Sequence, residues 1–168
     1  MLTKKDVKKL NNNVFNLIGN EWMLITAGNL KSMNTMTASW GGMGVLWNKD
    51  VAIIYIRPQR YTLNFVQKHD IFTLSFFDSA HKDILRFCGA KSGKNIDKIA
   101  ATGLEPFEME NKGIAFKQSK LVIECKKIYV DQIKEDKILD TSISISIYPE
   151  KDFHYIFIGE ILSCLTEN

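Results

Sequence analysis

Small hydroxyl residues and glycines gather in one stretch of the chain, Asn34 to Trp47. Thr35, Thr37 and Ser39 alternate there with apolar residues, which is the two-residue period of a strand with one hydroxyl face. Three glycines follow, and because they lack a Cβ, their backbone N–H groups can approach a ligand closely. This combination suits a phosphorylated ligand with a planar aromatic ring. A core strand followed by a glycine-rich hairpin would produce the same pattern.

Two arginines bracket a turn directly after the apolar run Val51–Ile56. Arg57 and Arg60 lie close to the hydroxyl of Thr62 in sequence. The forked guanidinium matches the oxygens of a phosphate, so the three side chains are candidates for binding one. The alternative is a pair of solvated loop arginines.

A second cationic segment surrounds the turn Ser92–Gly93, where Lys91, Lys94 and Lys98 are close in sequence. We expect this turn to begin a helix. A helix N-terminus flanked by lysines is a ready site for an anion.

His154 precedes the last apolar run of the chain. There it could give a proton or a hydrogen bond to a ligand ring, although a surface histidine at a strand end would look the same. The three histidines and three cysteines show no metal-ligand spacing, so no metal site is expected. No Gly-x-Ser-x-Gly nucleophile motif occurs either.

Length and composition indicate a single domain over residues 1–168. The chain is 45% apolar and 24% charged, which is the globular average. Its net charge of +3 is too small for a dedicated nucleic-acid binder. Its three cysteines form no C-x-x-C pair, and the N-terminus does not resemble a signal peptide. We therefore expect a cytoplasmic protein that uses neither nucleic acid nor membrane.

Strands are expected to outnumber helices, as in a closed or nearly closed antiparallel barrel with helical crossings. The expected strands are Trp22–Ala27, Asn34–Trp40, Val51–Ile56, Ile71–Phe77, Ile114–Phe116, Leu121–Ile133 and Tyr155–Leu165. The expected helices are Thr3–Leu10, Thr62–Lys68, Ser79–Phe87 and Asn95–Ala101. Asp140–Tyr148 alternates cleanly and by pattern reads as a further strand, although Pro149 and the charges after it favour a surface excursion.

In combination, these motifs resemble the flavin reductase-like FMN-binding split-barrel family, and within it the flavoredoxin branch. The resemblance covers about Trp22 to Ile161, with the motifs in family order. The motifs are Asn34–Gly42, Arg57–Thr62, Phe72–Phe76, Phe87–Lys98 and His154–Ile161.

The resemblance implies a mainly β fold, a six-stranded antiparallel split β-barrel of Greek-key type with short helical insertions. It also implies a homodimer with FMN near the subunit interface. The implied cofactor-binding residues are Asn34, Thr37, Ala38, Ser39, Trp40, Arg57, Arg60, Thr62, Ser75, Ser92, Gly93 and Lys94. Of these, Arg60 and Thr62 would hold the phosphate and ribityl chain with Arg57 in support, and Ser92 to Lys94 would close over the flavin. His154 and Lys94 are the implied catalytic residues, placed at the flavin ring or the incoming nicotinamide.

The activity that follows from the resemblance is hydride transfer from NAD(P)H to FMN and on to a second acceptor. An alternative is an electron carrier that receives electrons from a redox protein, because the chain has no Gly-x-Gly-x-x-Gly dinucleotide motif. A third reading is a barrel that has lost FMN binding and serves only in interactions.

Overall fold

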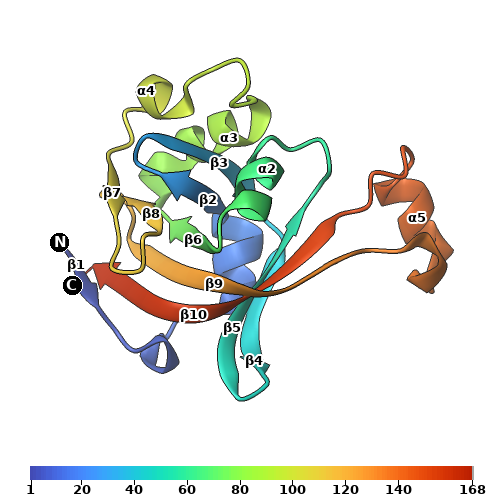
Figure 1. Cartoon of the computed structure of the whole chain (residues 1–168), viewed down its shortest axis with the longest axis horizontal. Coiled ribbons are helices and arrows are strands. Elements are labelled where there is room, and N and C mark those ends of the chain that lie inside the picture. Colours follow the sequence, from blue (N-terminus) through green and yellow to red (C-terminus); the bar gives the residue numbers. More distant parts are fainter. Residues whose placement is uncertain (168) are drawn as a thin grey trace.

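A large antiparallel sheet runs through the computed structural model, which describes residues 1–167 (Figure 1). Its strands are β1 (Leu2–Lys4), β2 (Met23–Asn29), β3 (Ser32–Ala38), β4 (Gly41–Leu46), β5 (Lys49–Ile56), β6 (Ile71–Phe76), β9 (Leu121–Gln132) and β10 (Tyr155–Glu167). They follow the order β3-β2-β6-β9-β10-β5-β4, and β1 pairs with β10. Two further strands, β7 (Pro106–Glu108) and β8 (Ile114–Phe116), form a separate small sheet.

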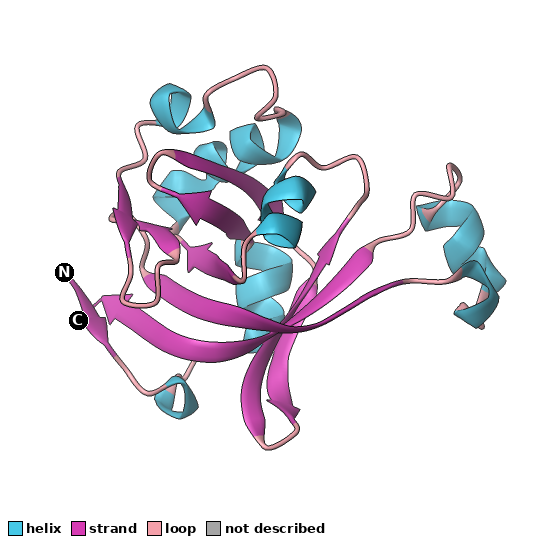
Figure 2. Ribbon diagram, viewed as in Figure 1, coloured by secondary structure: helices cyan, strands magenta, loops and turns pink. Residues whose placement is uncertain are grey.

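Short helices lie in the connections between strands (Figure 2). They are α1 (Val14–Asn16) with the π-helical turn Leu17–Glu21, α2 (Thr62–Lys68), α3 (Lys82–Ala90), α4 (Lys98–Thr102), α5 (Thr141–Ile147) and 3-10 turns at Val7–Lys9, Ser79–His81 and Glu135–Lys137. The helices α2 and α3 both pack against β2 and β3. No helix within residues 1–167 has the length and apolarity needed to cross a membrane.

The mainly β, antiparallel fold class is confirmed, but the strand count is larger than six. The sheet has eight strands because β1 and β4 also join it. Sequence patterns missed both, since β1 is three residues long and β4 is rich in glycine. Within residues 1–167, the end strands β3 and β4 do not pair with each other, so the strand pairing does not show closure of the expected barrel.

The glycines after Trp40 lie within a strand and not within a turn. Gly41–Leu46 forms β4, which pairs with β5. The hairpin turn falls later, at Trp47 and Asn48, whose φ angles are +52° and +58°. Such angles are typical of a tight two-residue hairpin turn, and asparagine, here Asn48, adopts them more readily than most residues other than glycine.

The N-terminal helix expected over Thr3–Leu10 is largely wrong. Leu2–Lys4 instead pairs with the end of β10. Only Val7–Lys9 is helical, as a single 3-10 turn that begins where the Asp6 carboxylate accepts a hydrogen bond from the Lys8 amide. The unpaired edge of β10 offers backbone partners to this segment, and a short lysine-rich helix has no comparable gain.

The strand pattern of Asp140–Tyr148 is also wrong, because Thr141–Ile147 forms α5. Figures 1 and 2 show α5 set apart from the body of the molecule, beyond the ends of β9 and β10. A strand there would have no neighbour to receive its hydrogen bonds, whereas a helix satisfies its backbone internally. Asp140 caps this helix through the Ser142 amide, and the Ser146 hydroxyl bonds to the Ser142 carbonyl.

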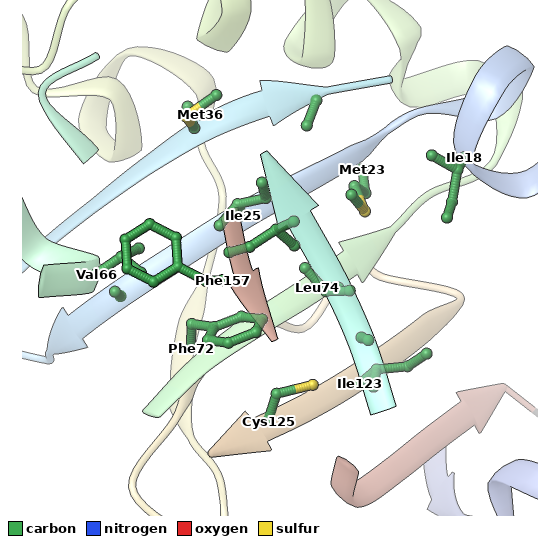
Figure 3. Close-up of a cluster of buried hydrophobic side chains, with 14 of the residues drawn as sticks. Ile18, Met23, Ile25, Met36, Val66, Phe72, Leu74, Ile123, Cys125 and Phe157 are labelled. Carbon is green, nitrogen blue, oxygen red and sulfur yellow. The ribbon is translucent and has the colours of Figure 1, made fainter. Parts of the chain in front are cut away.

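The main core fills the concave side of the curved sheet. Figure 3 shows side chains from several strands meeting there, among them Ile25, Phe72, Leu74 and Phe157. A second cluster, which includes Leu24, Phe77, Leu85, Cys88 and Phe116, lies between the sheet and α3. The two clusters fix β2, β3 and α3 relative to one another, and these elements carry most of the candidate site.

The core predicts a test at Gly159 in the middle of β10. A Cβ at this position would lie 2.6 Å from the Phe72 ring and 2.7 Å from Cys125 Cβ. We expect Gly159→Ala to lower the free energy of unfolding by about 2 kcal/mol, because overpacking a dense core costs this much.

Urea denaturation measures this effect, and Gly44→Ala is the control because nothing lies within 4 Å of a Cβ added there. Equal stabilities for the two variants would contradict the close packing around β10.

Candidate functional site

Two hollows meet along β3. The smaller, which we call the cationic hollow, has a volume of about 80 Å³. Its lining includes Asn34, Arg60, Thr62, Ser92 and Lys98. Lys91 lines it as well, so three cations converge with hydroxyls and an amide on one small space, which is the donor set that a phosphate group requires.

Lys98 is the most deeply enclosed cation of this hollow, with a residue exposure of 5%. Its ammonium donates to the carbonyls of Thr35 and Cys88, each at 2.8 Å. An ammonium has three N–H groups, so one remains for a ligand. Burial lowers the pKa of Lys98 from 10.5 to about 8, with the Cys88 thiol opposing this shift and Arg60 adding to it.

Arg60 reaches the same hollow from the turn after β5. One of its guanidinium nitrogens donates to the Gly89 carbonyl at 2.9 Å. The Cys88 and Gly89 carbonyls both belong to the last turn of α3, whose C-terminal carbonyls lack helical partners. The end of α3 therefore holds both cations in place, and the electronegative end of its dipole stabilises them. Burial and the nearby Arg57 lower the pKa of Arg60 from its ordinary value.

Asn34, Thr62 and Gly93 make another part of the wall of this hollow. The Asn34 amide donates to the Thr62 hydroxyl at 2.7 Å. A Cβ on residue 93 would lie 1.9 Å from Asn34 Oδ1, so only glycine lets this loop approach the amide so closely. Thr62 is the first residue of α2 and is buried. The turn at Arg57–Tyr61 brings it to the hollow.

The second hollow, which we call the ring hollow, has a volume of about 370 Å³ and shares Met36, Gln59 and Arg60 with the first. It is lined by Met36, Thr37, Ala38, Ser39, Trp40, Tyr55, Arg57, Gln59, Arg60 and His154. Its volume falls in the range of cofactor pockets. A cationic end that continues into an aromatic hollow fits a ligand with a phosphate at one end and a planar ring at the other.

His154 closes the ring hollow beside Trp40, with the two ring centroids 5.2 Å apart. It is buried, and its Nδ1 lies 2.8 Å from the Tyr148 hydroxyl. Burial and the neighbouring Arg57 lower the pKa of His154 to about 4, while Asp152 opposes the shift. The imidazole is therefore neutral at pH 7. We assign the more acidic phenol as the donor in this bond, which leaves the ring proton of His154 on Nε2.

Arg57 binds residues at and just after the end of α5. Its guanidinium bonds to the Asp152 carboxylate and, at 2.8 Å, to the Ile147 carbonyl. Gln59 also donates to Asp152, and the Arg57 guanidinium lies 5.4 Å from the centre of the Tyr148 ring. These contacts dock the C-terminal end of α5 and the residues just after it onto the turn after β5.

The structure brings together most of the side chains singled out in the sequence. Those lining one or both hollows are Asn34, Thr37, Ala38, Ser39, Trp40, Arg57, Arg60, Thr62, Ser92, Gly93 and His154. Ser75 is different, because it is fully buried in β6 and lines neither hollow. Lys94 also lines neither, and its ammonium lies 5.8 Å from the centre of the Tyr61 ring.

The helix expected to begin at Ser92–Gly93 starts later. Helix α4 begins at Lys98, and the Asp97 carboxylate caps it. It ends as expected at Gly103, whose φ is +68°. Because an acidic cap occupies its first turn, this helix offers no anion site of its own, and the cations of the hollow act through their side chains.

Sequence reasoning missed Lys98 and Tyr148 as site residues. In the sequence Lys98 is only one of three neighbouring lysines, and the one signal that distinguishes it is the Asp97 cap that precedes it. Tyr148 lies in a segment whose pattern predicted a strand, so nothing in the sequence placed its hydroxyl against His154.

Comparison with known proteins agrees with this geometry. The family model described as the flavin reductase like domain matches residues 15–168. The chain therefore belongs to the flavin reductase-like family. No curated protein sequence matches it significantly.

Solved structures share the fold at low sequence identity. A flavoredoxin from Methanosarcina acetivorans has a TM-score of 0.68 at 23% identity, over 98% of this chain and 77% of the other. An FMN-binding protein from Thermus thermophilus, with bound p-hydroxybenzaldehyde, has a TM-score of 0.71 at 18% identity, over 100% and 83%. An NADH:FAD oxidoreductase from Streptomyces globisporus has a TM-score of 0.65 at 14% identity, over 86% and 74%.

The buried neutral imidazole predicts a pH-dependent stability. Between pH 6.5 and about 4 the unfolded chain binds a proton at His154 that the folded protein does not. The folded state should therefore lose about 2 to 3 kcal/mol through this residue as the pH falls from 7 to 4.

Urea denaturation of the wild type and His154→Gln between pH 7 and 4 isolates the contribution of His154 to the free energy of unfolding, because His69 and His81 are common to both proteins. The wild type should lose more stability than the variant on acidification. Parallel pH profiles would contradict the assigned neutral state.

Proposed function

We propose that residues 1–168 form a single FMN-binding, flavin reductase-like domain. The observation that carries this proposal is the cationic hollow at Arg60 and Lys98, which continues into the aromatic ring hollow. Family membership and the FMN-binding protein of the same fold support the same cofactor.

In this proposal Arg60 and Lys98 bind the phosphate, with hydrogen bonds from Thr62 and Ser92. Asn34 and Gly93 shape the passage towards the ring hollow. Thr37, Ala38, Ser39 and Trp40 line one side of that hollow. These contacts fix the orientation of the ring relative to the phosphate, which is the main contribution a protein makes to flavin chemistry.

Two positions singled out in the sequence receive revised roles. Lys98 takes the place of Lys94 as the principal cation, because Lys98 lies in the hollow and Lys94 lies over Tyr61. Arg57 supports the site indirectly, since its charge is paired with Asp152. His154 remains next to the ring hollow, where Nε2 can donate a hydrogen bond to a ring oxygen or nitrogen.

The chemistry that bound FMN supplies is the acceptance of a hydride from NAD(P)H and its delivery to a second acceptor. The reductase is the leading form of the proposal. An electron carrier reduced by a protein partner is the second, and the shared fold of a flavoredoxin favours it. We also propose a homodimer, supported by apolar side chains left exposed at the far end of the molecule, with Leu139 at 96% and Ile145 at 76%.

Phosphate binding by Lys98 predicts that FMN affinity depends on pH. With a pKa of about 8 in the free protein, its ammonium loses its proton as the pH rises to 9. Binding a phosphate then requires proton uptake, so we expect FMN affinity to fall about tenfold between pH 7 and 9. The quenching of flavin fluorescence on binding measures this.

Lys98→Met should bind FMN more weakly at pH 7 and should lose this pH dependence. Lys68→Met is the matched control, because Lys68 is an exposed lysine outside both hollows. Wild-type affinity that stays flat up to pH 9 would exclude Lys98 from the phosphate site.

An anaerobic absorption spectrum separates the two forms of the proposed function. With FMN bound, we expect NADH or NADPH to bleach the flavin absorption within seconds. A bound flavin that neither nucleotide reduces would establish the electron carrier instead. Absence of flavin binding under all conditions would refute the cofactor assignment.

A further inference from the structure

A third and larger hollow, which we call the apolar hollow, opens beside the ring hollow. Its volume is about 750 Å³. The two hollows share Ser39, Trp40, Tyr55 and His154. Whatever binds in the apolar hollow therefore lies next to the space assigned to the flavin ring.

The lining of this hollow carries no charge. Its aromatic walls are Phe15, Trp40, Tyr55 and Tyr148, and no Lys, Arg, Asp or Glu contributes to it among the described residues. Arg60, Lys91 and Lys98 line the cationic hollow, and the charge of Arg57 in the ring hollow is paired with Asp152. A pyrophosphate in the apolar hollow would lose its water without meeting a counter-charge, which is costly.

Polar groups are few and lie close to the ring hollow. They include the imidazole of His154, the Tyr55 hydroxyl and the Ser39 hydroxyl. Since the Tyr148 hydroxyl occupies Nδ1 of His154, the free nitrogen is Nε2, which carries a proton. An apolar pocket with one or two convergent donors recognises a mostly apolar ligand that has a hydrogen-bond acceptor.

We propose that the apolar hollow binds the second substrate of the flavin site, and that this substrate is an uncharged planar aromatic carbonyl compound of the quinone type. This deepens the proposed function and rests on it. Aromatic walls would contact the ring faces, and His154 Nε2 would donate to a carbonyl oxygen. A quinone that takes a hydride from the reduced flavin and a proton from solvent leaves as the hydroquinone, and the flavin returns to its oxidised form.

Gly42 in β4 allows the hollow to be filled without disturbing its walls. It lines the apolar hollow but not the ring hollow, and nothing lies within 4 Å of a Cβ added there. Gly44, on the same strand, is equally open and does not line the hollow. Gly42→Leu and Gly44→Leu are therefore a matched pair that differ in whether the new side chain enters the hollow.

The experiment is calorimetric titration of menadione, an uncharged naphthoquinone, into each protein with and without FMN. The three free cysteines are buried, which protects them from quinone addition. We expect Gly42→Leu to weaken menadione binding at least tenfold and Gly44→Leu to change it less than twofold. FMN affinity should stay within twofold of wild type in both variants.

A second pair of variants removes an aromatic side chain, whereas the first pair adds a side chain. Phe15 is 88% exposed and Trp47 is 60% exposed, so neither truncation threatens the fold. Phe15→Ala should weaken menadione binding three- to tenfold, and Trp47→Ala, outside the hollow, should not.

The outcomes distinguish the two levels of the proposal. Loss of FMN binding in the wild type would refute the proposed function, whereas FMN binding without menadione binding would refute only the inference. Menadione affinity that Gly42→Leu leaves unchanged would place the quinone elsewhere. If sedimentation velocity shows that Gly42→Leu separates a wild-type dimer into monomers, the hollow is a subunit contact and the inference is overturned.

Discussion

The site depends on the pairing of β10, because this one strand is hydrogen-bonded to β9, β5 and β1. Its first half lies between β9 and β5, and its last residues bind the N-terminal strand. Shifting this register by one residue would move every side chain of the strand to the opposite face. His154 immediately precedes the strand, so the same register fixes where the imidazole enters the ring hollow. The tight contact of Gly159 with Phe72 and Cys125 holds that register against the core.

Charge is unevenly distributed along the three connected hollows. Arg60 and Lys98 concentrate positive charge at one end, where the last carbonyls of α3 stabilise it. The other end has aromatic walls and a neutral histidine. A phosphorylated ring compound can therefore occupy the first two hollows in only one direction. The same gradient leaves the third hollow suited to a ligand without charge.

The α5 segment connects the site to the most protruding part of the molecule. Arg57 and Gln59 hold Asp152, and Tyr148 holds His154. The helix itself lies apart from the body (Figure 1). Its apolar side chains Ile143 and Ile145 are exposed. Anything that covers this helix, a second subunit included, would bear on the orientation of Tyr148 and through it on the ring proton of His154. The network thus connects a contact on the surface of α5 to the ring hollow.

The sequence by itself determined the β-rich class, most of the long strands and α2, because these follow from local periodicity. The grouping of Asn34 with Arg60 and Thr62 was implied by the family resemblance, since Asn34 lies far from the other two along the chain. Only the tertiary structure decided that Lys98 and not Lys94 enters the hollow, since Thr35 of β3 and Cys88 of α3 provide the carbonyls that bind its ammonium. Likewise, the alternating Ser–Ile pattern of α5 favoured a strand, but no neighbouring strand was there to pair with it. Periodicity describes which faces a segment has, whereas the partners that satisfy its backbone and its charges come from distant parts of the chain.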